Sequence, residues 1–539
     1  MNQIKKVRNN SLVVQGSILI IASFLVRLIG MGYRIPLQWI IKDNGISYYQ
    51  AAFSIYSIII IISGYGIPIA VSKLISAKLT LREYKNAHRV FIGSLFFAVI
   101  SGSIGMSILW FGAPFFANLY NLPNSLYAIR ALAPTIFIVS ILGVFRGYFQ
   151  GMNTMVPTAL SQIIEQIANA AVSIIAAKSL IDMGVYYGAT GGTIGTGTGA
   201  LVGLVFVIFV YFLAKPMIHK RIQRDTHTNV LPYKKILKII LITVTPIVLG
   251  QTVFHITNYI DDVMFNQGLR FNGYGLKEIE KIFGMLSGKY RIIILLPISM
   301  GSAIAAATVP SIAKSLNLGK KEEVNRKIDV SIRFLMLLAI PAFVGILVLA
   351  APVLQLLFMV KPSSIVVNNL KLGSISIVFF CLSTIGIGIL QGLDRIKLPV
   401  YHTLIALSLK VILNIFLLFV FDTNMYGIII TNIIFSFTSA YLNMKSIKKI
   451  THFKFNRRKT FILPLASAIL MGIITYGSYN ITYYLISSNP FSTLFSVLLA
   501  IIVYGIFIVK FKVLEKDELL TMPKGKKIVD LLYKFRLLN

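Results

Sequence analysis

Long apolar runs constrain the fold of this chain more than any other feature. A membrane-spanning helix needs about 20 mostly apolar residues, and 56% of the 539 residues are hydrophobic, with a mean hydropathy of +0.79. A water-soluble protein of this composition would expose too much apolar surface to stay dissolved. The sequence therefore predicts an all-α integral membrane protein. Its fourteen predicted spans are 11–36, 47–72, 90–117, 126–149, 156–181, 191–214, 236–264, 286–313, 331–359, 365–392, 398–421, 424–444, 460–484 and 490–509.

The basic residues between these spans concentrate on one side of the membrane. If the N-terminus is cytoplasmic, the segments on that side hold 38 of the 52 Lys and Arg residues, and those on the opposite side hold 9. This bias is the positive-inside pattern of multi-pass proteins, and it predicts a bacterial cytoplasmic membrane protein with both termini in the cytoplasm. The net charge of +34 then reflects topology and attraction to anionic membrane lipid rather than nucleic-acid binding.

Two sequence patterns recur at nearly the same interval. QGMNTMVP at 150–157 is matched by QGLDRIKLP at 391–399, and the basic loop at 76–89 is matched at 312–326. Both pairs join equivalent apolar spans, which indicates a duplicated unit of six helices. The predicted architecture is therefore two parallel six-helix lobes (1–225 and 226–450), followed by two additional helices and a cytoplasmic tail (451–539).

The chain carries no motif of a common enzyme class. It has no Walker lysine motif, HExxH, GxSxG elbow or Cys/His cluster, and its single cysteine lies in an apolar span. The glycine-rich stretch GATGGTIGTGTGALVG at 188–203 has no basic residue to hold a phosphate. Small residues at such spacing favour close helix packing. Since the chain carries no enzyme motif, we predict a transporter rather than an enzyme, with no cofactor.

Two arginines lie in the first apolar run. Arg27 and Arg34 are seven residues apart, about two helical turns, and so project from one helix face. A charge at membrane depth must face water or a partner, which makes both candidates for binding an anionic substrate. Arg34 has an alternative, because it lies toward the outer end of the run and Pro36 is expected to end the helix there.

A polar stripe marks the fifth span. Gln162, Glu165, Gln166 and Asn169 are spaced three and four residues apart and must face protein or water rather than lipid. Glu165 is expected to pair with Arg27 or with Arg146, either in a substrate cavity or as a structural ion pair. Arg146, near the cytoplasmic end of the fourth span, is a candidate for receiving substrate or for anchoring the helix end.

A second set of polar residues lies in the second half. Lys410 and Asn414 are four residues apart on the eleventh span, Asp261 and Asp262 are expected at the end of the seventh, and Arg291 begins the eighth. A bridge from Lys410 to Asp261 or Asp262 would hold the lobes together. The alternative is a role in coupling transport to an ion or proton.

The stretches RLIGMGYRIPL, SGYGIPIAVSKLISAK and GVFRGYFQGMNTMVPTALSQIIEQ resemble the lipid flippases of the MOP superfamily. The resemblance is to the MurJ and stage V sporulation protein B branch of the polysaccharide biosynthesis proteins, and it covers spans one to twelve. It implies two six-helix lobes, alternating access and export of undecaprenyl-pyrophosphate-linked lipid II. The cavity arginines of that family correspond to Arg27 and Arg34.

The resemblance also bears on coupling and on the alternatives. Some members bind sodium through helices seven and eleven. In this chain Lys410 occupies the place of a second carboxylate, which argues against sodium or proton coupling. The Lys410 ammonium is instead our candidate for a tethered charge. We expect a monomer. The alternatives are export of another polyprenyl-linked glycan, a MATE-type drug or cation antiporter, which should carry acidic cavity residues, and a membrane acyl- or glycosyltransferase.

Overall fold

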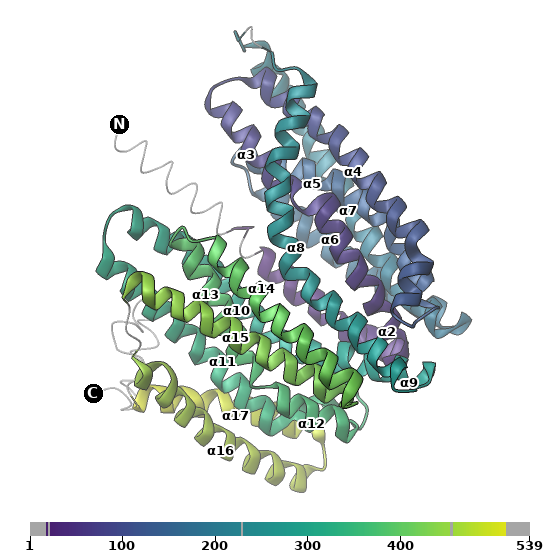
Figure 1. Ribbon diagram of the computed structural model, residues 1–539, viewed down its shortest axis with the longest axis vertical. Coiled ribbons are helices and arrows are strands. Elements are labelled where there is room, and N and C mark those ends of the chain that lie inside the picture. Colours follow the sequence, from purple (N-terminus) through teal and green to yellow (C-terminus); the bar gives the residue numbers. More distant parts are fainter. Residues whose placement is uncertain (1–17, 20–21, 228–229, 453–455, 512, 514–539) are drawn as a thin grey trace. The chain divides into compact units, whose positions relative to one another are not determined.

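Helices make up almost all of the structure, a computed structural model that describes residues 18–19, 22–227, 230–452, 456–511 and 513. No β-strand occurs among these residues. The all-α prediction is confirmed. Figure 1 shows long helices running side by side, as in the contacts of α4 (Tyr84–Leu119) with α5 (Ser125–Gly151).

The chain divides into two compact units between Gly288 and Lys289. Beyond α4 and α5, unit 1 contains a helix at 22–32, α2 (Arg34–Ile60), α3 (Ile67–Thr80), α6 (Val156–Leu180), α7 (Val185–Gln223), α8 (Tyr233–Phe271) and α9 (Leu276–Gly284). Unit 2 contains α10 (Arg291–Asn317), α11 (Lys321–Phe358), α12 (Ser364–Gly373), α13 (Ser376–Gly392), α14 (Lys397–Asn414), α15 (Asn424–Thr451), α16 (Leu463–Ile486) and α17 (Asn489–Lys510).

The compact units and the predicted lobes divide the chain at different places. In unit 1, α8 packs against α2, α3 and α4, and α9 packs against α2. These two helices follow residue 225 in the sequence, so the structural division at 288/289 reflects packing whereas the predicted lobes at 1–225, 226–450 and 451–539 follow the sequence repeat. The lobe boundaries stay a prediction.

The described residues include ten helices that are long and apolar enough to cross a membrane, or eleven if the bent pair α12 and α13 forms one span. Three predicted spans are not among them: 11–36, which lies partly outside the described residues, 47–72 and 236–264. The total of fourteen therefore stays a prediction. The other predicted spans overlap helices, with ends that differ by one residue for 398–421 against Lys397–Val420 and by as many as ten for 331–359 against Lys321–Phe358.

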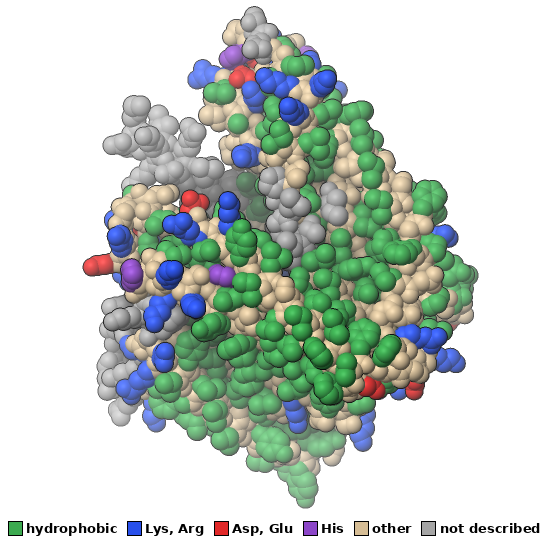
Figure 2. All heavy atoms as spheres, in the orientation of Figure 1, with side chains coloured by type: hydrophobic (Ala, Val, Ile, Leu, Met, Phe, Trp, Pro, Cys, Tyr) green, Lys and Arg blue, Asp and Glu red, His purple; other side chains and the backbone are tan. Residues whose placement is uncertain are grey.

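Apolar side chains cover the outer surfaces of both units. Phe111 (78% exposed), Leu213 (67%) and Leu485 (72%) are among many large hydrophobic residues that no part of the protein covers. Figure 2 shows such side chains along the helices, while Lys and Arg gather near helix ends. Apolar surface of this extent requires a lipid environment, so the chain is a multi-pass membrane protein.

The sequence predicts that the helix containing Arg34 ends at Pro36, but in the structure this helix continues past Pro36. Backbone hydrogen bonds continue across Tyr33, and α2 runs on to Lys42, where the backbone leaves the helical region (φ 55°, ψ −171°). Pro36 is the third residue of α2, so the helix continues through a proline whose missing N–H removes one backbone hydrogen bond. The break at Lys42 therefore ends this segment, six residues later than expected.

The first repeated sequence pattern forms the same turn twice. Asn153 (φ 59°) and Asp394 (φ 60°) both adopt the left-handed conformation, 241 residues apart. Each donates its N–H to the carbonyl three residues earlier (3.0 and 3.1 Å), and the next N–H, of Thr154 or Arg395, donates to the carbonyl five residues earlier (3.0 and 2.8 Å). Helix α5 thus turns into α6 as α13 turns into α14.

The second repeated pattern behaves in the same way. Arg82 (φ 61°) and Gly319 (φ 71°) occupy equivalent positions 237 residues apart, and each donates its N–H to the carbonyl three residues earlier, at 3.1 and 2.9 Å. Two equivalent turns at nearly one interval support the predicted internal duplication.

The glycine-rich stretch packs α7 closely against α6. Four glycines spaced four residues apart, Gly191, Gly195, Gly199 and Gly203, lie along one face of α7. A Cβ at Gly199 would lie 2.5 Å from the carbonyl oxygen of Glu165, a distance that no side chain can occupy. The predicted packing role of this stretch is confirmed. The close packing also determines which residues of α7 lie beside the polar stripe of α6.

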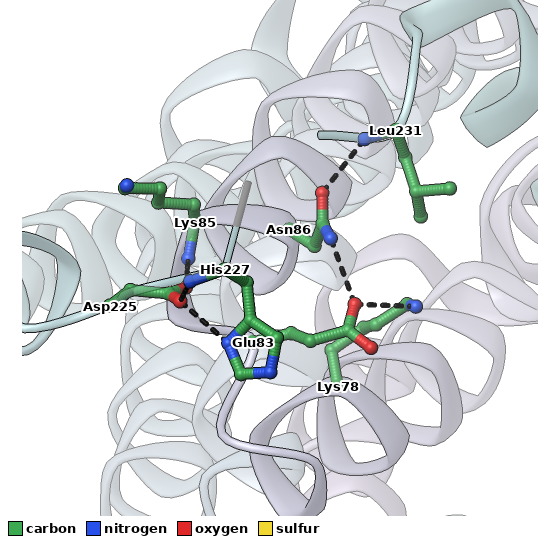
Figure 3. A network of polar contacts seen from close by, with 7 residues as sticks. All are labelled: Lys78, Glu83, Lys85, Asn86, Asp225, His227 and Leu231. Atoms are coloured by element: carbon green, nitrogen blue, oxygen red, sulfur yellow. Dashed lines mark hydrogen bonds and ion pairs between the residues drawn. The ribbon is translucent and has the colours of Figure 1, made fainter. Parts of the chain in front are cut away.

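A polar network holds the segment after α7 against the start of α4 (Figure 3). Asp225 Oδ2 accepts a hydrogen bond from the backbone N–H of Lys85 (2.7 Å). Asp225 Oδ1 accepts one from the backbone N–H of His227 (2.9 Å) and lies 2.8 Å from His227 Nδ1. Burial alone would raise the pKa of Asp225, but these hydrogen bonds lower it to about 2. The carboxylate is therefore charged at any physiological pH.

A second carboxylate extends this network. Glu83 Oε2 accepts from Lys78 Nζ (2.8 Å) and Asn86 Nδ2 (2.8 Å), while Asn86 Oδ1 accepts the N–H of Leu231 (2.9 Å). The Lys78 ammonium, with the Asn86 amide, holds the pKa of Glu83 below its usual range. Both ends of the segment that leads into α8 are thus attached to the α3–α4 turn.

Candidate functional site

An ion pair between α5 and α6 forms the centre of the candidate site in unit 1. Arg146 Nη2 lies 2.6 Å from Glu165 Oε2, and Arg146 Nε donates to Ser161 Oγ at 2.9 Å. The side chains are 12% and 23% exposed, so the pair is largely shielded but not fully buried. The predicted pairing of Glu165 is confirmed, and its partner is Arg146 rather than Arg27.

Gly203 of α7 leaves the space that this pair occupies. A Cβ at this position would lie 3.2 Å from Glu165 Cβ and 3.6 Å from Arg146 Nη2. Any larger residue would press on the ion pair from the third helix. The buried Tyr56 of α2 is also close enough to interact electrostatically with Glu165.

The other members of the polar stripe differ in their surroundings. Asn169 is buried, and its Oδ1 accepts from Ser173 (3.0 Å) and Thr196 (3.4 Å), so it joins α6 to α7. Gln162, one turn before Glu165, has a buried Oε1 that accepts no hydrogen bond from the described part of the chain. A buried acceptor without a partner costs about 1–3 kcal/mol, which makes Gln162 the better candidate for contact with a ligand.

The helix at 22–32 passes directly over this stripe. A Cβ at Gly30 would lie 3.1 Å from Gln166 Nε2, so Gly30 allows close approach to α6. Arg27 precedes Gly30 by three residues and Arg34 follows it by four, which places all three on one helix face. The helix face that carries both arginines therefore approaches α6 at Gly30, while Arg34 itself contacts the later part of α2.

The two arginines have different environments. Arg34 is half-buried, and its guanidinium lies 5.8 Å from the ring centre of Tyr49 and 5.7 Å from that of Phe53. Tyr49 in turn shares a hydrogen bond with Tyr33 (2.8 Å). Arg27 is exposed and forms no ion pair with any acidic residue that the structure describes. Arg34 is held by aromatic rings, whereas Arg27 is free to meet an anion.

Asp261 and Asp262 are buried in unit 1, and their place at the end of the seventh span stays a prediction. Helix α8 continues to Phe271. Asp262 Oδ2 accepts a hydrogen bond from Ser54 of α2 at 2.6 Å, and Ser54 also accepts from Gln50 (3.0 Å). The Ser54 hydroxyl of α2 thus supplies a partner for a carboxylate that lies inside α8.

Lys410 and Asn414 are buried in unit 2, where both contact α15. Lys410 Nζ donates to Asn432 Oδ1 at 2.9 Å and lies 4.9 Å from the ring centre of Phe435, and Asn414 Oδ1 accepts from Thr431 at 2.7 Å. Arg291 is the first residue of α10, as predicted. A Lys410 bridge to Asp261 or Asp262 would join the two units and stays a prediction.

Sequence reasoning missed the partners of these buried charges. Ser54, Asn432 and Ser161 carry short polar side chains in apolar helices, and nothing in their spacing distinguishes them from other membrane serines and asparagines. It also missed Glu280 of α9, which accepts a hydrogen bond from Tyr48 of α2 at 2.5 Å. Only the acidic character of Glu280 in an amphipathic segment could have singled it out.

Comparison with known proteins agrees with this architecture. The family model described as "Polysaccharide biosynthesis protein" matches residues 12–316, and the one described as "MatE" matches residues 289–416. The lipid II flippase MurJ of Bacillus subtilis (strain 168) is 26% identical over 414 residues, which cover 74% of this chain and 76% of that protein. Stage V sporulation protein B of the same organism is 24% identical over 321 residues, 59% and 61% of the two chains.

A solved structure, lipid II flippase MurJ in an inward closed conformation, superposes with a TM-score of 0.65. The match has 17% sequence identity and covers 91% of this chain and 98% of that one. The fold is therefore shared across nearly the whole chain. Since the first family model covers more than half of the sequence, this chain belongs to the polysaccharide biosynthesis protein family and has the fold of the MOP-superfamily transporters.

Proposed function

We propose that this protein is a flippase that moves a polyprenyl-pyrophosphate-linked glycan from the cytoplasmic to the outer leaflet by alternating access, and that lipid II is its cargo. The observation that carries the proposal is the position of Arg27 and Arg34 on the helix face that approaches α6 at Gly30. The name of the MurJ relative supports the choice of lipid II.

The site chemistry suits a pyrophosphate. Arginine presents a planar array of N–H donors that matches phosphate oxygens, and such charge-assisted hydrogen bonds are about twice as strong as neutral ones. Arg27 is exposed and has no acidic partner among the described residues. Gln162 adds a buried polar atom to the polar stripe of α6, two turns before Asn169. An anionic head can bind here while a prenyl tail stays in the lipid.

The same site disfavours a cation antiporter. A cationic drug requires an acidic group that is free to receive it, but Glu165 is bound to Arg146 at 2.6 Å. With Arg27 and Arg34 nearby, the net charge of this set is positive. The site therefore repels organic cations and attracts anions.

The membrane potential supplies a driving force. Moving one elementary charge through 100 mV is worth about 2.3 kcal/mol, so a head with about two negative charges gains roughly 4–5 kcal/mol on moving outward from a negative interior. The emptied positive site is drawn inward by the same field. In unit 2 the buried Lys410 ammonium serves as a tethered charge in place of a bound cation.

The test is transport of fluorescent lipid II by the purified full-length protein in liposomes. We expect Arg27→Gln to slow transport about ten-fold or more, because a lost charge-assisted hydrogen bond is worth about 1.5–3 kcal/mol. Arg27→Lys should retain part of the rate, and Arg82→Gln, which removes an exposed charge at the α3–α4 turn, should retain all of it.

Two results decide between cargoes. Faster transport of lipid II than of a polyprenyl-pyrophosphate carrying a different glycan supports the lipid II assignment, and the reverse order replaces it with the other glycan. Equal rates for the wild-type protein and Arg27→Gln would refute the role of this site.

A further inference from the structure

One end of unit 2 contains a cavity of about 830 Å³ that the proposed transport site does not use. The turn between α13 and α14 forms one wall, and the last turns of α15 form the other. Its polar lining comes from six residues: Asp394, Arg395, Lys397, Tyr401, Ser446 and Lys449. The basic-residue pattern of the sequence assigns this end of the helices to the cytoplasmic side.

The cavity carries an excess of positive charge. Arg395, Lys397 and Lys449 line it together with one carboxylate, Asp394. No ion pair links any of the three cations to an acidic side chain in the part of the chain that the structure describes. Three cations held around one cavity create a local positive potential that attracts an anion.

The fold does not require these cations. The equivalent turn of unit 1 has the same left-handed residue and the same backbone hydrogen bonds, but Thr154 and Val156 stand where unit 2 has Arg395 and Lys397. A turn that forms equally well without charge leaves the basic side chains unexplained by local structure. Their presence around a cavity points to a ligand.

The cavity continues into an apolar surface along α14. Tyr401 lines the cavity and is 60% exposed, and Ile405 (55% exposed) and Ile412 (53%) follow it at helical spacing. A tyrosine between a basic region and an apolar helix face is typical of the membrane–water interface. The ligand is thus expected to be an amphiphile with an anionic head and an apolar tail.

A chain of hydrogen bonds fixes the Ser446 side chain in the wall of the cavity. Ser446 Oγ lies 3.2 Å from Nε2 of the buried His402, whose Nδ1 lies 2.8 Å from Asn443 Oδ1. This chain of hydrogen bonds holds the Ser446 side chain at the cavity wall. Because the Nδ1–H of His402 donates to Asn443 Oδ1, the Nε2 of a neutral imidazole accepts from the Ser446 hydroxyl, so the wall is fixed and the cations supply the donors to a phosphate oxygen.

We propose that this cavity binds the phosphate group of an anionic membrane phospholipid, whose acyl chains lie along the exposed face of α14. Basic cavities between membrane helices on the cytoplasmic side are suited to such head groups. The C-terminal segment 510–539 is a poorer occupant, since it carries 8 Lys and Arg against 4 Asp and Glu and would be repelled. The site is separate from the transport site, so it stands whether or not the cargo is lipid II.

The test is a binding titration of the full-length protein in neutral detergent, followed by native mass spectrometry. The probes are short-chain phosphatidylglycerol, short-chain phosphatidylcholine and inorganic phosphate. We expect phosphatidylglycerol to bind, and Arg395→Gln with Lys397→Gln and Lys449→Gln to weaken it about 100-fold, at about five-fold per cation. Arg395→Thr with Lys397→Val, the residues of the unit 1 turn, should weaken it about 25-fold.

A control variant removes the same charge from the same end of unit 2. Lys314, Lys445 and Lys448 are exposed and line neither wall of the cavity, so their joint change to Gln should leave phosphatidylglycerol affinity unchanged. An equal loss in this control would overturn the proposal in favour of diffuse surface charge. Equal binding of phosphatidylcholine would overturn the role of charge, and equal binding of inorganic phosphate would overturn the role of the acyl chains.

Crosslinking of the wild-type protein decides the matter even if the triple variant fails to fold. A phosphatidylglycerol with a photoreactive group near its head should label peptides that contain 394–401 or 446–450. Labelling confined to other peptides would refute the site.

Discussion

The ion pair between Arg146 and Glu165 can be separated into a structural and a functional contribution. Losing one partner of a buried pair costs about 3–5 kcal/mol because the other charge stays buried alone. With side chains 12% and 23% exposed, water offsets part of this cost, and we expect about 2 kcal/mol for Arg146→Met or Glu165→Met. Replacing both residues by Met leaves no unpaired charge, so the double variant should lose less than either single one.

Thermal unfolding gives the stability side of this prediction. The two tryptophans of the chain, Trp39 and Trp110, both lie in unit 1, so intrinsic fluorescence reports on the unit that contains the pair. A loss of about 2 kcal/mol should lower the Tm by about 4 °C or more, at roughly 2 °C per kcal/mol. The double variant should unfold within about 2 °C of the wild type.

Transport gives the functional side. If the pair contributes to substrate handling, the Met/Met variant stays stable yet moves lipid II about ten-fold more slowly, or worse. Lys78→Met is the matched control, because it breaks the Lys78–Glu83 pair (2.8 Å) in the same unit at a site with 25% and 18% exposure. This pair has similar exposure but lies in the basic segment 73–89 between predicted spans, and Glu83 keeps its hydrogen bond from Asn86, so its loss should cost about 0–1 kcal/mol and transport should not change.

Two results would refute this reasoning. Single variants that are no less stable than the double variant would show that the two charges are not coupled. A Met/Met variant that transports like the wild type would show that the pair is structural only.

Three further predictions concern packing, pH and charge. Gly199→Ala should destabilise unit 1 by about 1–3 kcal/mol, because the new Cβ would lie 2.5 Å from the Glu165 carbonyl oxygen. Gly477→Ala is the control and should not destabilise the protein, because open space surrounds this glycine. Thermal unfolding followed by fluorescence checks the first variant, and unfolding followed by circular dichroism checks the second. Asp225 has a pKa of about 2 in the folded protein, below its ordinary 3.8, so its stabilisation is complete above pH 4 and disappears as the pH falls toward 2; in Asp225→Asn, melting curves should lose this pH dependence. Lys410→Ala should lower both transport and stability, and unchanged values in both assays would refute its role as a tethered charge.

The sequence was informative wherever lipid dictates the structure. A helix in hydrocarbon must be apolar along about 20 residues, so predicted spans such as 424–444 coincide with helices such as Asn424–Thr451. Positions where protein replaces lipid were less predictable. Pro36 looked like a helix end, but α2 continues through it to Lys42, and no sequence pattern singled out Ser54 as the partner of Asp262.

The candidate site was predictable to the extent that helical spacing determines it. The three- and four-residue spacing of α6 placed Glu165 on a polar face, and Arg146 was one of two partners that the sequence offered. The choice between Arg146 and Arg27 depends on how α5 packs on α6, which no local pattern encodes. The approach of Gly30 to Gln166 likewise follows from tertiary packing alone.

The central claim is that positive charge on the first helix carries a lipid pyrophosphate across the membrane with the help of the membrane potential. The most direct measurement is the rate of outward movement of fluorescent lipid II in liposomes that contain the purified protein, with and without an imposed potential. We predict that an inside-negative potential accelerates outward movement and that Arg27→Gln removes the acceleration. A rate that is independent of the potential, or an uncharged polyprenyl-linked glycan moving as fast as lipid II, would contradict the claim.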